Sequence, residues 1–239
     1  MAKQQNPEEE PAGNDPQAYE IEEVVARQSA KRSESSSGEF FMKYRRLIGG
    51  AVLGVIVLVA AFFFYRDYQT EQEQEALNTA YQTFRFFEQD SFQKALTSDI
   101  GRPSLEDIAS EYSGTGTGNL ANYLTGVAHL EQGNLDQAVS YLEDFDPGDE
   151  MISAANYSAL ATAYEEKGDF AKAAELYEKA AGINENSQTS PFFLQNAARC
   201  LEEGNDLEAA LEMYKRIKRE YPNSPEGQNV EKYIYRLSV

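Results

Sequence analysis

The second half of the sequence repeats itself, and this repetition constrains the fold more than any other feature. The copies occupy residues 119–150, 154–187 and 191–223. An alanine recurs at the same place in each copy, as Ala138, Ala173 and Ala210, at spacings of 35 and 37 residues. Leucine or phenylalanine stands three residues before each alanine, and leucine or tyrosine stands four residues after it. Self-similarity at this period predicts a stack of similar supersecondary units.

The spacing within each copy predicts two helices joined by a tight turn. Gly133 and Gly168 lie at the turn of the first two copies, and Asn205 takes that place in the third. Glycine and asparagine both tolerate a left-handed backbone, so the exchange keeps the turn. The small alanine lets the two helices approach closely, and the larger side chain four residues later lies on the same face. One pair is too small to bury its apolar face alone, so neighbouring pairs must stack.

These residues resemble the tetratricopeptide repeat. The second copy carries the resemblance best, at Tyr157, Leu160, Ala161, Tyr164, Gly168, Asp169, Phe170, Ala173, Tyr177 and Ala180. The third copy adds Pro222, where the family ends its second helix. The first copy departs from the pattern, with Asn122 and His129 in place of the usual tryptophan and tyrosine. The resemblance implies a helical solenoid that binds other proteins and is not an enzyme.

Two flanking regions complete the predicted stack. Residues 67–118 are expected to form leading helices and a degenerate repeat. Their apolar residues at helical spacing are Leu77, Ala80, Tyr81, Phe84 and Phe87. Residues 224–239 are expected to form a capping helix, because Ser224-Pro225 places proline at the first helical position.

An apolar run of 18 residues without charge, Leu47 to Phe64, precedes the repeats. As a helix it is about 27 Å long, close to the hydrocarbon thickness of a bilayer. A cleaved signal peptide is the alternative, but the preceding 46 residues exceed an ordinary n-region. Residues 43–66 are therefore predicted to be an uncleaved anchor with a basic flank. The predicted fold class is all-α: a single transmembrane helix followed by an α-solenoid of tetratricopeptide-type helix pairs.

The charges on either side of the apolar run predict its orientation. Basic residues precede the run at Lys43, Arg45 and Arg46. Acidic residues follow Arg66 at Asp67, Glu71, Glu73 and Glu75. The positive-inside rule therefore places the N-terminus in the cytoplasm and the large C-terminal domain across the membrane. In a bacterial cell this is the inner membrane, and the domain is periplasmic.

Residues 1–42 are predicted to be a disordered cytoplasmic tail, because prolines and serines leave too little apolar surface to offset chain entropy. Two interpretations of residues 18–32 stay open. The segment is either a weakly amphipathic helix that docks on a partner or on lipid, or a solvated linker.

The chain is strongly acidic, with a formal net charge of −19. Residues 67–239 contain 13 Lys+Arg and 31 Asp+Glu, a net charge of −18. Such a domain repels phosphate backbones, so nucleic-acid binding is not expected. The acidity serves either solubility or the attraction of a basic partner. The single cysteine, Cys200, excludes an intrachain disulfide and is predicted to be a buried, inert thiol.

No motif in the sequence predicts a catalytic, cofactor or metal site. The stretch Gly114 to Gly118 (Gly-Thr-Gly-Thr-Gly) has no lysine after it and no predicted strand before it, so it is not a phosphate loop. It is expected to be a loop between helices, with Asn119 as the cap of the next helix. His129, the only histidine, is expected in or near the core, and no Ser/His/Asp set can be assembled around it.

Partner binding is expected on the concave groove that the first helices of such repeats line. The candidate residues are Tyr123, Val127, Glu131, Ser158, Thr162, Glu166, Gln195, Arg199 and Glu203. The lysines and asparagines that clamp a C-terminal carboxylate in some relatives are missing here. The groove instead suits segments with apolar and basic groups. The alternative is that some of these side chains only pack against the next repeat.

The order of tail, single span and translocated repeat domain resembles one group in particular. This is the group of ancillary subunits of the bacterial SecYEG translocon, known as the YfgM-like group. The resemblance covers residues 40–239 and implies a periplasmic scaffold or co-chaperone whose partners are translocon subunits, chaperones or exported clients. The alternative is a structural subunit of another envelope complex, for division or outer-membrane assembly.

Overall fold

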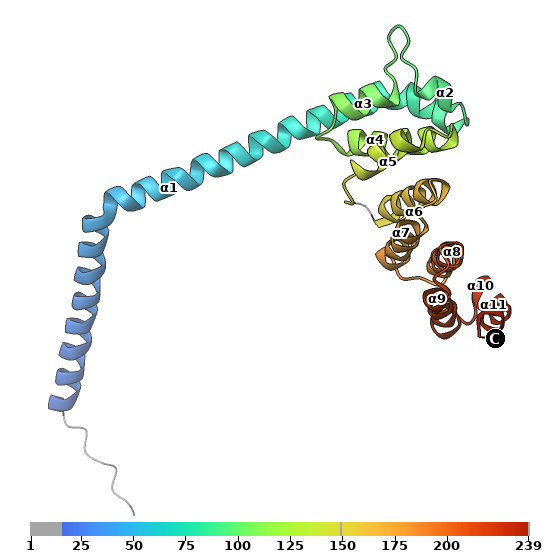
Figure 1. Cartoon of the computed structure of the whole chain (residues 1–239). Coiled ribbons are helices and arrows are strands. Elements are labelled where there is room, and N and C mark those ends of the chain that lie inside the picture. The colour runs from blue at the N-terminus through green and yellow to red at the C-terminus, as the bar shows by residue number, and fades with distance from the viewer. Residues whose placement is uncertain (1–15, 149, 239) are drawn as a thin grey trace, which may run out of the picture. The chain divides into compact units, whose positions relative to one another are not determined.

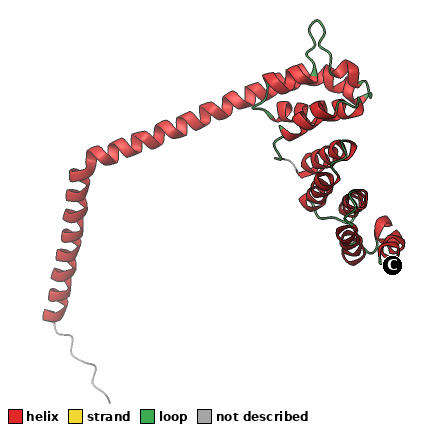
Figure 2. Cartoon of the chain, in the orientation of Figure 1, coloured by secondary structure: helices red, strands yellow, loops and turns green. Residues whose placement is uncertain are grey.

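The computed structural model describes residues 16–148 and 150–238 of the chain (Figure 1). That part of the chain contains eleven helices and no strand, which confirms the all-α prediction (Figure 2). The chain forms two compact units, Met1–Tyr65 and Arg66–Val239. The helices are α1 (Pro16–Glu88), α2 (Phe92–Ala95), α3 (Leu105–Glu111), α4 (Gly116–Glu131), α5 (Leu135–Glu143), α6 (Glu150–Glu166), α7 (Phe170–Ile183), α8 (Ser190–Glu203), α9 (Leu207–Glu220), α10 (Pro225–Asn229) and α11 (Glu231–Leu237).

The described residues of the first unit form the N-terminal part of α1. The structure differs here from the predicted disordered tail, because residues 16–42 are helical, while residues 1–15 lie outside the described residues. Pro16 suits the first helical position, and the next proline in the sequence is Pro103, so no proline interrupts the helix. An ion pair of 2.7 Å between Glu23 and Arg27, one turn apart, adds a small stabilisation.

In the second unit the helices follow one another as pairs, α4 with α5, α6 with α7 and α8 with α9 (Figure 1). Gly133, Gly168 and Asn205 have φ values of 74°, 81° and 62°, so all three turns use the predicted left-handed residue. The amide after each of them donates to a carbonyl five residues earlier, which closes the end of the first helix. The predicted turn is therefore confirmed in each copy. The predicted limits of the domains stay predictions.

The recurring alanines are buried in all three helix pairs. Ala138, Ala173 and Ala210 are all 0% exposed. The larger residues that follow them join one continuous core cluster, which extends from Leu142 to Val230. Because this cluster crosses from pair to pair, the apolar face of one pair is buried by the next, as the repeat pattern predicts.

Only part of the apolar face predicted for the leading helix is buried in the structure. Ala80 is buried, but Leu77 and Tyr81 are 52% and 63% exposed. The helix is rotated so that Ala76 and Ala80 pack against α3, while Thr83 lies fully buried and donates to the Pro103 carbonyl at 2.6 Å. The sequence pattern missed this rotation, because small and hydroxylated residues can form an inner face that an apolar count does not detect.

The Gly-Thr-Gly-Thr-Gly stretch leads into the first turn of α4, which donates hydrogen bonds to a carboxylate of the same chain. The backbone amides of Gly116 and Thr117 donate to the Glu73 carboxylate at 2.7 and 3.0 Å, and the Thr117 hydroxyl donates at 2.5 Å. Thr115 caps the helix through Gly118 N at 3.0 Å, so the prediction that Asn119 is the cap was wrong. The side chain of Asn119 lies within the first turn, where it accepts a hydrogen bond from Asp146 N at 2.7 Å.

This contact generates a prediction about the join between α1 and the stack. Glu73→Ala removes the acceptor of two amides and one hydroxyl at a helix N-terminus, so we expect the free energy of unfolding to fall by about 1–3 kcal/mol. Urea titration of the full chain in detergent, followed by circular dichroism, measures the change. Glu75→Ala is the matched control, because Glu75 is exposed on the same helix. An equal loss in both variants would contradict the proposed contact.

Candidate protein-binding groove

The nine predicted groove residues lie on the first helices of the three pairs, α4, α6 and α8, and none of them is fully buried. They form three columns along the stack. Glu131, Glu166 and Glu203 make up the outermost column, and all three are exposed. Within the described residues none of these glutamates forms an ion pair. The carboxylates of this column are therefore accessible to solvent.

At the first pair, the candidate residues also pack within the stack. The Tyr123 ring lies edge-on to Phe145, with ring centroids 6.3 Å apart, and burial raises the pKa of Tyr123. Val127 packs against the main core cluster. Both side chains are half-buried, so each has a packing role and still presents some apolar surface to the groove.

At the second pair, the groove residues are held by hydroxyl contacts. The hydroxyl oxygens of Thr162 and Tyr177 share a hydrogen bond of 2.9 Å, and Thr162 also donates to the Ser158 carbonyl at 3.1 Å. Burial raises the pKa of Tyr177. The Thr162 side chain therefore has a fixed position between the core and the groove.

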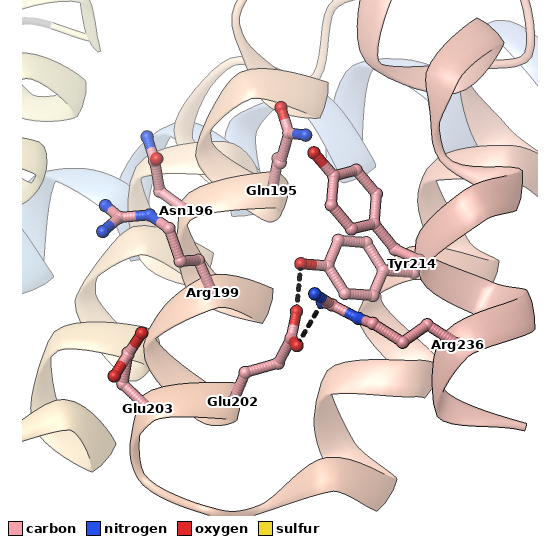
Figure 3. A pocket seen from close by; sticks show the side chains of 8 residues that line it. Gln195, Asn196, Arg199, Glu202, Glu203, Tyr214 and Arg236 are labelled. Atoms are coloured by element: carbon pink, nitrogen blue, oxygen red, sulfur yellow. Dashed lines mark hydrogen bonds and ion pairs between the residues drawn. The ribbon is translucent and has the colours of Figure 1, made fainter. Parts of the chain in front are cut away.

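At the third pair the groove deepens into a cavity of about 350 Å³ between α8 and the C-terminal helices (Figure 3). Its walls are Gln195, Asn196, Arg199, Glu202, Glu203, Tyr214, Tyr233 and Arg236. Three of the nine predicted residues thus share one cavity, whereas the other six lie along the first two pairs. The cavity walls are mostly polar or charged, with two tyrosine rings as the apolar part.

The side wall of this cavity is a network that the sequence analysis did not identify. Glu202 accepts a hydrogen bond of 2.6 Å from the Tyr214 hydroxyl and forms an ion pair with Arg236, as Figure 3 shows. Tyr214 is only 2% exposed, and burial together with Glu202 raises the pKa of Tyr214. The Tyr233 ring stacks on Tyr214 with centroids 4.9 Å apart. These contacts dock α11 onto the third pair.

The same network occurs one pair earlier. Glu165 accepts hydrogen bonds from Nη1 and Nη2 of Arg199, at 2.6 and 3.1 Å, and a longer one of 3.4 Å from the Tyr177 hydroxyl. In both networks the arginine follows its glutamate by 34 residues. Arg236 therefore occupies in α11 the place that Arg199 occupies in α8. The 37-residue shift that relates Ala173 to Ala210 also relates these two arginines, which is the signal that would have identified Arg236 in the sequence.

The single cysteine and the single histidine of the chain are both buried. Cys200 is 0% exposed, and its Sγ lies 3.5 Å from Glu165 Oε2. Burial raises the pKa of the Cys200 thiol to about 12, which agrees with the predicted inert thiol. His129 is 4% exposed, as predicted for a core residue, and its Nε2 lies 2.9 Å from Glu106 Oε1. Its Nδ1 has no hydrogen-bond partner among the described residues, and the ring stacks on Tyr141.

The repeated network generates a prediction with an adjacent control. Glu202→Ala leaves the buried Tyr214 hydroxyl without its acceptor and releases Arg236, so we expect a loss of about 1–3 kcal/mol in the free energy of unfolding. Glu203→Ala removes an exposed carboxylate of the same helix that makes no hydrogen bond within the described residues, and should change stability little. Chemical denaturation compares the two variants, and hydrogen exchange in α11 locates the effect. Equal stability of both variants would show that the network does not hold α11.

Two family models match the chain. Residues 164–232 match a tetratricopeptide repeat, and residues 38–149 match a tetratricopeptide repeat-like domain. The second match begins before the apolar run and ends in the linker that precedes α6. Comparison with curated protein sequences found no match.

Among solved structures, the chain is similar to the nearly identical TPR-like repeats of a putative kinesin light chain from Podosopora anserina. That crystal structure shows 17% identity and a TM-score of 0.48, and the likeness covers 71% of this chain and 85% of that chain. A variant of the same protein gives 17% identity and 0.48, over 71% and 84%. The two family matches carry the assignment: the chain contains tetratricopeptide-type repeat domains.

Proposed function

We propose that this protein is a membrane-anchored scaffold whose repeat domain binds segments of other proteins in its groove. The observation that carries the proposal is the combination of an exposed apolar helix with protein-binding repeats in one chain. The family match from residue 38 to residue 149 supports it, because one model spans both the apolar run and the leading helices. Tetratricopeptide repeats are protein-interaction modules, and catalysis is not part of the proposal.

The exposure of the apolar run supports a membrane anchor. The described residues contain one helical segment apolar and long enough to cross a bilayer, with a mean hydropathy of 2.8 in its best window, and 0% of that window is buried. A core helix of a water-soluble protein buries such a window within the fold. A helix that is apolar and exposed all around is instead suited to lipid. The basic flank before the run favours a cytoplasmic N-terminus and a periplasmic repeat domain.

The chemistry of the groove supports a ligand with apolar and basic groups. Tyr123 and Val127 present partly exposed apolar surface, and the exposed column of Glu131, Glu166 and Glu203 presents carboxylates. The arginines of the groove, Arg199 and Arg236, are both engaged by glutamates of the neighbouring repeat. They are therefore poorly placed to clamp a terminal carboxylate, and an extended or helical basic segment fits better.

The finer proposal is that this scaffold works beside the Sec translocon as a co-chaperone. It rests on the topological resemblance given above. Its partners would be translocon subunits, chaperones or exported clients, with neither nucleic acid nor a cofactor involved. A fixed stoichiometric partner in place of many clients would favour the structural subunit of another envelope complex.

The anchor predicts the behaviour of the chain in cell fractions. We expect the full chain to sediment with membranes, to resist extraction with alkaline carbonate and to dissolve in detergent. Deletion of residues 43–66 removes the apolar run and should leave the repeat domain in the aqueous fraction. Mass spectrometry of the full chain tests the uncleaved state. A product that starts after the apolar run, or a full chain that stays soluble without detergent, would contradict the anchor.

The groove predicts where partners touch the domain. A photo-crosslinking residue in place of Thr162 or Gln195 should capture translocon subunits or exported clients in cells, because both positions belong to the proposed groove. The control position is Glu208, an exposed residue on the second helix of the third pair. Captured proteins are identified by mass spectrometry. Equal capture at Glu208, or recovery of neither class from the groove positions, would reject the proposal.

A further inference from the structure

A second surface with different chemistry lies at the start of the repeat domain. We define the Phe86 surface as Tyr81, Arg85, Phe86, Lys94, Ile100 and Arg102. It is built by the end of α1, by α2 and by the loop between α2 and α3, which projects from these helices in Figure 1. It shares no residue with the groove.

The projecting loop ends in a tight turn with an isoleucine at its tip. Asp99 and Arg102 exchange two backbone hydrogen bonds of 2.9 Å, and Gly101 has a φ of 75°. The Asp99 carboxylate accepts a hydrogen bond of 2.7 Å from Ile100 N. Ile100 itself is 102% exposed, although isoleucine is among the residues most often buried in folded proteins. The turn therefore holds an apolar side chain fully in solvent.

The base of the loop is fixed to the helices around it. The Arg102 guanidinium donates to the Lys94 carbonyl at 2.9 Å. The Ser98 hydroxyl donates to the Asp107 carboxylate, and this bond together with those from Ser104 lowers the pKa of Asp107. These hydrogen bonds hold the loop that carries Ile100 in place. A partner that contacts Ile100 therefore loses less binding free energy to ordering of the loop.

Two cations lie over one aromatic ring beside this loop, and a third lines the cavity next to the ring. The Arg102 guanidinium lies 4.9 Å from the centroid of the Phe86 ring, and Lys94 Nζ lies 5.6 Å from it. Arg85 lines a shallow cavity of about 360 Å³ together with Tyr81 and Phe86. The cavity is large enough for one apolar side chain of a partner, with positive charge at its edge.

These cations differ from the others of the domain. Residues 67–239 contain 13 Lys+Arg, and nine of them form ion pairs with carboxylates. Within the described part of the chain, the four others have no carboxylate partner. Arg85, Lys94 and Arg102 are three of these four, and the fourth, Lys232, lies over Tyr233. In a domain with 31 acidic residues, this clustering of unpaired cations is complementary to an acidic ligand.

We infer that the Phe86 surface docks an acidic segment of a partner protein. The carboxylates of that segment pair with Arg85, Lys94 and Arg102, and one of its apolar side chains enters the cavity beside Tyr81 and Phe86. Ile100 packs against the partner as a single anchor. A protein fits this surface better than a lipid bilayer does, because a cavity of side-chain size is matched by one residue, whereas a lone isoleucine gives a bilayer little apolar contact.

Fluorescence anisotropy with the full chain in neutral detergent tests this inference. The probe is a labelled synthetic peptide with a central leucine and phenylalanine flanked by glutamates. We expect the triple variant Arg85→Gln, Lys94→Gln, Arg102→Gln to bind it at least about tenfold more weakly. Ile100→Ser should weaken binding about threefold to fivefold without altering the fold, because the side chain contacts only solvent. Lys232→Gln is the control with an unpaired cation elsewhere, and should bind like the unmodified chain.

Each other outcome overturns the inference. Absence of binding to the acidic peptide, or equal affinity of the unmodified chain and the triple variant, excludes an acidic ligand at this surface. If vesicles of phosphatidylglycerol bind through the three cations while the peptide does not, the surface contacts lipid instead. If the three cations are needed only for self-association, measured by sedimentation, the occupant is a second copy. Because the probe is acidic and the groove residues stay unchanged, none of these results decides the function proposed for the groove.

Discussion

Burial of apolar surface between neighbouring helix pairs is the interaction on which the rest of this structure depends. No pair covers its own apolar face, because each consists of two short helices with a stripe of alanines and a few larger residues. The zero exposure of Ala138, Ala173 and Ala210 sets the close approach within a pair, and the continuous cluster from Leu142 to Val230 joins the pairs. The nine predicted groove residues all lie on the first helices of the pairs, so the stacking of the pairs sets their positions.

Hydrogen bonds and ion pairs between neighbouring repeats fix the orientation in which the apolar faces stack. Apolar contacts are non-directional, so they tolerate small slides between repeats, whereas a bidentate pair such as Arg199 with Glu165 has one geometry. The same network occurs at Glu202. There it binds α11, which stands where the first helix of a further repeat would stand. Arg199 and Arg236 are thereby held within the stack, whereas Glu131, Glu166 and Glu203 are exposed and form no ion pair within the described residues.

The sequence predicted those features that local chemistry decides. The turns at Gly133, Gly168 and Asn205 need a left-handed residue, and the alanines need close helix contact, so both can be recognised without knowledge of the fold. What it did not predict depends on distant partners. Glu73 reaches the amides of α4 across more than forty residues, and the rotation that exposes Leu77 and Tyr81 is decided by packing on α3. The N-terminal segment is a further example, because its composition predicted disorder whereas residues 16–42 are helical.

The distribution of unpaired charge suggests how one acidic chain can distinguish partners. Most cations of the domain are neutralised by neighbouring carboxylates, so the remaining charges determine its electrostatic surface. In the two proposals, the exposed glutamate column attracts basic segments to the groove, and Arg85, Lys94 and Arg102 attract acidic segments to the Phe86 surface. Because the two surfaces share no residue, occupation of one leaves the contacts of the other intact. On the two proposals together, a single anchored domain can therefore hold a basic and an acidic partner side by side, which is what a scaffold requires.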